Sequence, residues 1–390
     1  MTAVAEVIAP PIARRGGEPW GGRVRAYSMV VALVMIWITF DYATGGLFLH
    51  PRNFSNLMRQ MAITGVLSVG MLMVIVTGEI DLSVGSLVGL TGLIAALLQT
   101  SLGWGLVPTL LLAMACGLFI GLLQGSVVAY GRVPSFIVTL GGLLAWRGVT
   151  KGISSGATIP VQLPGFASIG QSYLDKPWGV VLAGAAVLAV AASGWRIQHS
   201  RKRLGLPVST PLKLGLRICV PCVLAVSLVA MLNGYEGIPV PVLIFLCIAL
   251  AGALVMSHTV LGRYMYAVGG NREAARLSGI NTRRLTVAVF GIMGVLAALA
   301  GIMYTARVGS ASPDAGLLLE LDAIAACVIG GASLMGGRGA VFGACLGALL
   351  MASLDNGMSL KNVSDYIQDI VKGGILVAAV ALDMLGRKRG

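Results

Sequence analysis

Two carboxylates interrupt a stretch of sequence that is otherwise continuously apolar. Glu79 and Asp81 lie in the sequence VTGEIDLSVGS, with apolar runs on both sides. Ionisable groups are costly within or near a bilayer and usually mark function there. In one interpretation Asp81 and Ser83 cap a helix that begins near Val84; in another, a broken helix presents these polar groups and free backbone dipoles to a solute pathway. The two interpretations are compatible, and the sequence leaves both open.

A second candidate for chemistry is the C-x-x-C formed by Cys219 and Cys222 at the start of an apolar run. A redox pair would need an accessible, electropositive site, and a zinc site would need two further ligands. The surrounding sequence offers neither, and His50, His199 and His258 are isolated from one another. We therefore predict no metal site and no cofactor. The remaining cysteines lie inside apolar runs and are interpreted as core thiols: Cys116, Cys247, Cys327 and Cys345.

The composition indicates a membrane protein. Hydrophobic residues make up 57% of the 390 residues, only 11% are charged, and the mean hydropathy is +0.89, which is far from an average soluble domain. The 54 glycines suit membrane helices, which use small residues to bring backbones into contact. The net charge of +13 does not indicate nucleic-acid binding, because the basic residues lie in short stretches between apolar runs without aromatic residues among them.

The apolar runs predict an all-α fold, a single polytopic transmembrane helix bundle covering residues 1–390. A spanning helix needs about 20 mostly apolar residues, and roughly 10–12 runs have that length or slightly less. Several runs are short or interrupted by glycine, so we expect one or two re-entrant or broken helices. The expected spans are 27–47, 60–76, 84–98, 105–129, 135–150, 178–193, 214–232, 241–256, 286–307, 321–335, 340–353 and 366–385.

Lys and Arg residues in the short connections predict the orientation. With about twelve spans, four basic clusters fall on one side, which we expect to be the cytoplasm, with both termini inside. Residues 1–26 are expected to form a cytoplasmic tail, and the first apolar run is too long for a typical signal-peptide core, so we expect it to be retained. The opposite side carries scattered charges such as Lys151 and Lys176. The clusters are Arg14, Arg15, Arg23 and Arg25; Arg196, Arg201, Lys202 and Arg203; Arg263, Arg272, Arg276, Arg283 and Arg284; and Arg387, Lys388 and Arg389.

The expected cytoplasmic loop 258–285 contains a polar segment that predicts a short helix outside the membrane. Asn271 is a suitable N-cap, Glu273 places negative charge in the first turn and Arg276 places positive charge near the last. Gly279 can adopt the left-handed conformation that ends a helix. A helix of about two turns is unstable by itself in water, so we expect something to pack against it.

Three segments together resemble the permease subunits of ribose/xylose-type bacterial ABC sugar importers. They are EIDLSVGS at 79–86, the loop from Gly269 to Ile280, and ELDAIAACVIGG at 320–331, and their order and spacing match along nearly the whole chain. Within that family, Glu79, the stretch 353–359 and an additional region from about 176 to 239 favour the members that transport D-xylose over those that transport ribose.

The resemblance implies an ABC importer permease fold with broken helices in a bacterial inner membrane. Two copies of the chain would form the pathway, two ABC ATPase subunits would bind on the cytoplasmic side, and a periplasmic sugar-binding protein would deliver the sugar. The chain would be a transport subunit and not an enzyme, and it contains no G-x-x-x-x-G-K-[ST] phosphate loop, so ATP hydrolysis by that route would come from another subunit.

In such importers a short cytoplasmic helix of the permease docks on the ATPase and couples nucleotide-driven closure to movement of the spans. The alternative is an ordinary loop helix on the permease's own surface. The residues that match the coupling role are Arg263, Gly270, Asn271, Arg272, Glu273, Ala274, Ala275, Arg276, Ser278 and Gly279.

The sugar itself is neutral. A pathway whose lining binds the sugar weakly releases it more readily than a tight binding site would. The candidate pathway groups are Thr77, Glu79, Asp81, Ser83, Asp322 and Asn356. The candidate contacts to the binding protein are Arg52, Arg59 and Lys361.

Other functions remain possible from the residues alone. A proton-coupled secondary sugar carrier would use Glu79 or Asp81 as a proton relay and would transport without an ATPase. An importer of another pentose, such as ribose or arabinose, would share the same architecture. An intramembrane enzyme would need a nucleophile, base or metal constellation within the spans, and no such grouping is visible in the sequence.

Overall fold

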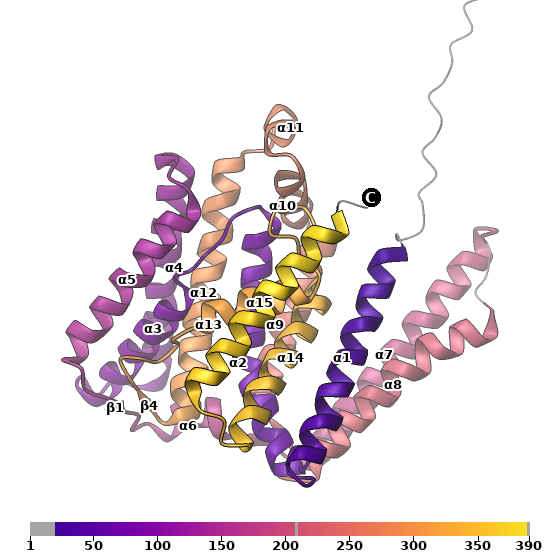
Figure 1. The fold of residues 1–390 in the computed structure, drawn as a ribbon, viewed down its shortest axis with the longest axis horizontal. Helices are drawn as coiled ribbons and strands as arrows, with labels where there is room; N and C mark the ends of the chain where they lie inside the picture. The colour runs from indigo at the N-terminus through magenta and orange to yellow at the C-terminus, as the bar shows by residue number, and fades with distance from the viewer. Residues whose placement is uncertain (1–19, 207–209, 388–390) are drawn as a thin grey trace, which may run out of the picture.

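The computed structural model describes residues 20–206 and 210–387, and these are almost entirely helical (Figure 1). The prediction of an all-α bundle is confirmed, with only two pairs of two-residue strands among the described residues. The helices are α1 (Trp20–Ala43), α2 (Pro51–Val76), α3 (Val84–Thr100), α4 (Leu106–Gly131), α5 (Ser135–Ser154), α6 (Pro164–Gln171), α7 (Lys176–Arg203), α8 (Pro211–Asn233), α9 (Val240–His258), α10 (Val260–Gly270), α11 (Arg272–Leu277), α12 (Thr282–Val308), α13 (Leu319–Ile329), α14 (Val341–Leu360) and α15 (Asp365–Arg387).

The strands are short connections at one end of the bundle. Strand β1 (Ile159–Pro160) pairs antiparallel with β4 (Ser310–Ala311), with Ile159 opposite Ala311. Strand β2 (Tyr173–Leu174) pairs antiparallel with β3 (Ile238–Pro239). These ladders join connections that lie far apart in the sequence, and so they fix the helix ends to one another.

Every expected span overlaps one of these helices, so the chain is a multi-pass membrane protein. Six of the described helices are long and apolar enough to cross a membrane, namely α2, α4, α7, α9, α12 and α14, whereas α1, α3 and α8 carry shorter apolar stretches. The span expected at 321–335 is only partly helical, because α13 ends at Ile329 after 11 residues. Glycines follow that end, and Gly331, Gly336 and Gly337 take positive φ angles that a helix cannot accommodate.

The helices run between two ends of the bundle. Helices α10 and α11 lie at one of them, which we call the α11 end, and β1, β4 and α6 lie at the other (Figure 1). Helix α7 ends and α8 begins toward the α11 end, so the basic residues at the end of α7 are on the same side as those of α11 (Figure 1). Helix α1 begins at Trp20, inside the expected tail 1–26. Arg14, Arg15, Lys388 and Arg389 lie outside the described residues.

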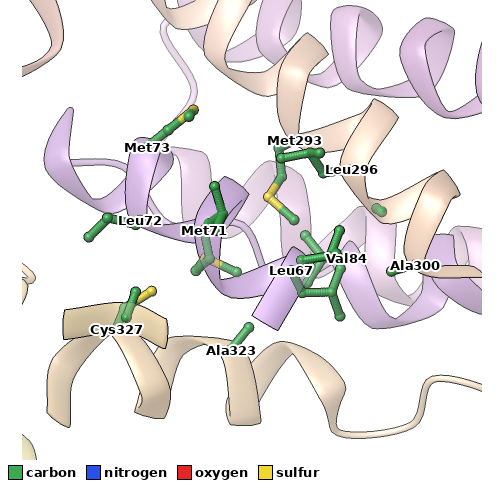
Figure 2. Packing of buried hydrophobic residues seen from close by; sticks show 14 of the residues in the cluster. Leu67, Met71, Leu72, Met73, Val84, Met293, Leu296, Ala300, Ala323 and Cys327 are labelled. Carbon is green, nitrogen blue, oxygen red and sulfur yellow. The ribbon is translucent and has the colours of Figure 1, made fainter. Parts of the chain in front are cut away.

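The core lies where α2 meets α12 and α13. Leu67 and Met71 of α2 pack toward Met293 of α12 and Ala323 of α13, as Figure 2 shows. The thiol of Cys327 is fully buried there and lies 3.2 Å from the Ser68 carbonyl oxygen, to which it donates, which confirms its interpretation as a core thiol. Close packing of these side chains contributes many small dispersion contacts to the bundle's interior.

The core interpretation was wrong for Cys247, whose side chain is exposed on α9. Helix α9 is apolar all round, because its outer face belongs to the membrane rather than to the protein core. Apolar surroundings in the sequence therefore do not separate a residue that faces lipid from one that faces other helices.

Glycines bring α4 and α12 into backbone contact. A Cβ atom added to Gly294 would collide with the carbonyl oxygen of Gly117, and one added to Gly121 would collide with that of Phe290. Small residues are what such close approach requires in a membrane, where packing and not the hydrophobic effect drives helix association. The high glycine content thus has the packing role that the composition indicated.

Two interrupted helices meet at the α11 end of the core. The chain leaves helical conformation at 77–83, between α2 and α3, and again at 330–340, between α13 and α14. The Gly337 N–H donates to the Val76 carbonyl oxygen over 2.9 Å, and the Tyr266 hydroxyl of α10 donates to the Gly339 carbonyl oxygen over 2.8 Å. We call this meeting point of 76–83, 266–270 and 330–340 the junction.

The additional region of residues 176–239 forms a peripheral hairpin of α7 and α8 (Figure 1). The two helices pack on each other, with Gly194 against Ile218, and the Asn233 side-chain amide donates to the Lys176 carbonyl oxygen over 3.2 Å. Only 6% of the most apolar window of α7 is buried. The hairpin therefore adds little to the core and leaves the junction to the other helices.

Candidate functional site

The polar segment of the sequence forms a capped helix, as predicted. The Asn271 side-chain oxygen accepts from the Ala274 N–H over 2.9 Å, and Gly279 ends the segment at φ +85°. Within the helix the Arg276 guanidinium lies 2.6 Å from the Glu273 carboxylate. Its hydrogen bond and charge hold the pKa of Glu273 below the usual range of a glutamate. Helix α11 is only six residues long, but capping interactions stabilise both of its ends.

The expected coupling residues form one exposed surface at the α11 end. Ala275 is the exception, because it is buried against the bundle and fastens the helix. Leu277 is 76% exposed. The remaining expected residues are exposed: Arg263, Gly270, Asn271, Arg272, Glu273, Ala274, Arg276, Ser278 and Gly279.

An ion pair joins α11 to the break between α2 and α3. The Arg272 Nη1 atom lies 2.5 Å from Glu79 Oε1, and Arg272 Nη2 donates to the Thr286 hydroxyl of α12 over 3.3 Å. The Glu79 side chain is 9% exposed and that of Arg272 is 49% exposed, so the pair stands at the edge of the protein interior. No sequence pattern predicted this pair, whose residues are 193 positions apart.

The second carboxylate of the break, Asp81, is turned inward and is 3% exposed. Its Oδ1 atom accepts from the Ser83 N–H over 2.9 Å and lies 2.6 Å from the Ser83 hydroxyl. Ser83 also lies 3.0 Å from the Gln124 side-chain oxygen of α4. Asp81 thus closes the turn that leads into α3, but Ser83, at the N-cap position, makes no side-chain capping bond.

The N-terminus of α5 holds the backbone of the same break. The Ser135 hydroxyl accepts from the Ile80 N–H over 3.2 Å, and the Thr139 hydroxyl lies 3.3 Å from the Ile80 carbonyl oxygen. The backbone of this irregular segment is therefore satisfied by side chains of a neighbouring helix, which is how a membrane protein tolerates a broken helix.

A charged cavity of about 340 Å³ lies beside the ion pair. Glu79 and Arg272 line one part of it, and Arg283 of α12 and Arg132 of the connection between α4 and α5 line another. Arg132 adopts φ +57°, a left-handed conformation at the end of α4. The cavity leaves space for the Arg272 side chain to move relative to the break without displacing packed core residues.

Of the other candidate pathway residues, Thr77 begins the break, whereas Asn356 and Asp322 lie elsewhere. Thr77 donates its hydroxyl proton back to the Val74 carbonyl oxygen over 2.7 Å. Asn356 lies toward the opposite end of the bundle, where its side-chain amide exchanges two hydrogen bonds with that of Asn53, over 2.8 and 3.1 Å. The six candidates are thus distributed over three places rather than one.

Asp322 belongs to a buried charge cluster that sequence reasoning missed. The Lys372 Nζ atom of α15 lies 3.3 Å from Asp322 of α13 and 2.9 Å from Asp355 of α14. The lysine fastens α15 to both helices, because removing it would leave two carboxylates without their cation. A signal was present, since Lys372 lies within the expected span 366–385, where ionisable residues usually mark function.

Comparison with known proteins defines the class. Residues 53–380 match the family described as branched-chain amino acid transport system, permease component. The chain belongs to this family of membrane transport permeases. No solved structure matches the fold.

The individual relatives are sugar-transport permeases. The xylose transport system permease protein XylH of Escherichia coli is 46% identical over 368 residues, which cover 94% of this chain and 93% of the relative. XylH of Haemophilus influenzae is 46% identical over 366 residues, covering 94% and 98%. The ribose import permease protein RbsC of Escherichia coli is 36% identical over 356 residues, covering 91% and 92%. These similarities confirm the resemblance that the sequence motifs carry.

The Glu79–Arg272 pair is testable by a double-mutant cycle. We expect Glu79→Gln and Arg272→Gln to show a coupling energy of about 1–3 kcal/mol in the free energy of unfolding, because each residue compensates the other's charge. Unfolding in mixed micelles measures it. The matched control cycle combines Glu79→Gln with Arg276→Gln, which pairs elsewhere, and should be additive. Additive effects in the Glu79–Arg272 cycle would contradict the pairing.

Proposed function

We propose that this chain is the membrane-spanning permease subunit of an ATP-driven ABC importer that carries D-xylose from a periplasmic binding protein into the cytoplasm. The observation that carries the proposal is 46% identity to xylose permeases across 94% of the chain, against 36% to a ribose permease. The higher identity to the xylose permeases than to the ribose permease favours xylose as the cargo. The fold with its broken helices suits a transport subunit.

The proposed membrane is the bacterial inner membrane, with the α11 end in the cytoplasm. Basic residues of α7, α10, α11 and α12 gather at that end, as expected for cytoplasmic connections. Helices α1 and α15 begin and end there (Figure 1), so both termini would be cytoplasmic. The opposite end would face the periplasm.

The proposed partner at the α11 end is a separate ABC ATPase subunit, which would hydrolyse the ATP. The exposed face of α11 offers Glu273 and Arg276 for polar contacts and Leu277 for an apolar one, while Ala274 allows close approach. Two permease copies and two ATPase subunits would complete the importer.

The Glu79–Arg272 pair supports a route for coupling. A movement of α11 that follows ATPase closure would either displace residues 77–83 or break a partly buried ion pair. Because the same segment leads into α3, the displacement would change the conformation of the break that faces the proposed pathway. We propose Thr77, Glu79, Asp81 and Ser83 as the inner part of the pathway, and Asp322 and Asn356 as groups further along it.

At the periplasmic end the binding protein would dock on exposed basic residues. Arg52 is exposed at the start of α2, and Lys361 reaches the Ala43 carbonyl oxygen over 3.0 Å at the end of α14. Arg59 lies close to this rim but is half-buried. Basic rim charges would steer an acidic partner rather than supply most of its affinity.

The cargo is tested by reconstituting permease, ATPase and binding protein in proteoliposomes. We expect uptake of labelled D-xylose that requires ATP, persists with an uncoupler, and is inhibited less by ribose or arabinose than by unlabelled xylose. Uptake that needs no ATP and stops with the uncoupler would contradict the proposal in favour of a secondary carrier. Preferred uptake of another pentose would contradict the assignment of the sugar.

The ATPase contact is tested by substitutions on α11. We expect Ala274→Trp and Glu273→Arg to reduce co-purification with the ATPase roughly tenfold or more, because bulk or reversed charge at the centre of an interface is poorly tolerated. Membrane insertion should be unchanged, since both side chains are exposed.

Arg201→Glu is the control for these substitutions. Arg201 is exposed at the same end of the bundle but on the peripheral hairpin, and its reversal should leave the ATPase bound. Undiminished co-purification of both α11 variants would mean that α11 is a loop helix on the permease's own surface.

A further inference from the structure

A second cavity of about 480 Å³ lies at the end of the bundle opposite α11. It is formed where the start of α2 approaches β2 and the turn between α8 and β3. Its volume falls within the range of small-molecule sites, about 300–1,000 Å³. We call it the outer cavity. None of its residues takes part in the α11 site or the junction.

One wall of the outer cavity is aromatic. The rings of Tyr173 and Tyr235 lie edge to face, with centroids 5.8 Å apart and planes at 76°. The Arg59 guanidinium carbon stands 4.4 Å from the Tyr173 centroid, which fixes that ring by a cation–π contact. Tyr235 therefore contributes to a preformed wall whose orientation does not need to change when a ligand arrives.

The cavity lining also carries planar polar groups. Arg59 and Asn56 both line it, and a guanidinium and a side-chain amide each present N–H donors. The Asn56 side-chain oxygen accepts from Arg307 over 3.3 Å, and this bond orients its amide group. Asn53, which also lines the cavity, is held by its mutual amide pair with Asn356.

We propose that the outer cavity binds a monosaccharide on its way into the permease. A sugar ring offers apolar C–H faces to an aromatic wall and hydroxyl oxygens to N–H donors, and the cavity supplies both. A metal cation is not suited to it, because no carboxylate lines the cavity among the described residues. The nearby Glu236 carboxylate interacts electrostatically with Arg59 and offsets part of the positive charge that Arg52 and Arg59 bring to the cavity.

This inference rests on the proposed function, since it identifies where the imported sugar first contacts the permease. It extends the proposal by assigning Arg59, Asn56, Tyr173 and Tyr235 to the sugar rather than to the binding protein. Binding should be weak, roughly millimolar, because a site on a transport route must also release its ligand.

The test is saturation-transfer-difference NMR of D-xylose with the permease–ATPase complex in nanodiscs, without binding protein. We expect a saturable xylose signal for the wild type. Tyr235→Leu and Arg59→Gln should weaken binding roughly fivefold or more, since the first removes an aromatic ring and the second removes a guanidinium from the cavity lining. Tyr42→Leu is the matched control, because Tyr42 lies at the same end of the bundle but is 90% exposed on α1, and its signal should equal the wild type's.

Co-purification with the ATPase reports whether each variant is folded. If one of these variants does not fold, Asn56→Ala replaces it in the binding test, because Asn56 is exposed. Absence of a saturable wild-type signal would overturn the inference, as would unchanged binding by the folded variants. A signal displaced by inorganic phosphate but not by unlabelled xylose would identify an anion site and overturn it too.

The same variants distinguish a docking surface from a sugar site. If they abolish binding of sugar-free binding protein and leave the xylose signal intact, the cavity is a docking surface and the inference is wrong. ATP-driven xylose uptake by the wild-type system tests the proposed function separately. Uptake without a saturable signal at the outer cavity would reject this inference alone.

Discussion

The ion pair between Arg272 and Glu79 connects the surface of the protein to the irregular centre of its bundle. A carboxylate that is 9% exposed cannot lose its cation without a free-energy cost, and so the break between α2 and α3 depends on the position of α11. Helix α11 in turn is too short to be stable alone. It is held by its Asn271 cap and by the buried Ala275, which leaves its outer face exposed.

The surroundings of this pair are rigid in some places and yielding in others. Nearly all of α2 is buried among α12, α13 and α14, and glycine contacts lock α12 to α4, so these helices move as units. The segments 77–83 and 330–340 lie outside the helices and are held by turn hydrogen bonds and by contacts with neighbouring segments, such as that from the Gly337 N–H to Val76. Displacement of α11 would therefore be absorbed at the junction rather than in the helices.

Much of the fold follows from the sequence, because apolar length and capping residues are local properties. The spans, the N-cap at Asn271 and the left-handed Gly279 were all predictable. What could not be predicted depends on contacts between distant segments: the pairing of Arg272 with Glu79, the cluster around Lys372, and the cavity wall formed by Tyr173 and Tyr235. Hydropathy also failed to show that Cys247 faces outward, since lipid and protein interior are similarly apolar.

The central claim is that the ion pair transmits movement of α11 to the break. The most direct measurement is the number of xylose molecules imported per ATP hydrolysed by the reconstituted complex carrying Glu79→Gln. The control is a separate complex carrying Asp314→Asn, because Asp314 forms an exposed ion pair with Lys151. The account predicts that Glu79→Gln keeps the ATPase bound and active but lowers this ratio severalfold, while the control does not. An unchanged ratio in Glu79→Gln would contradict it.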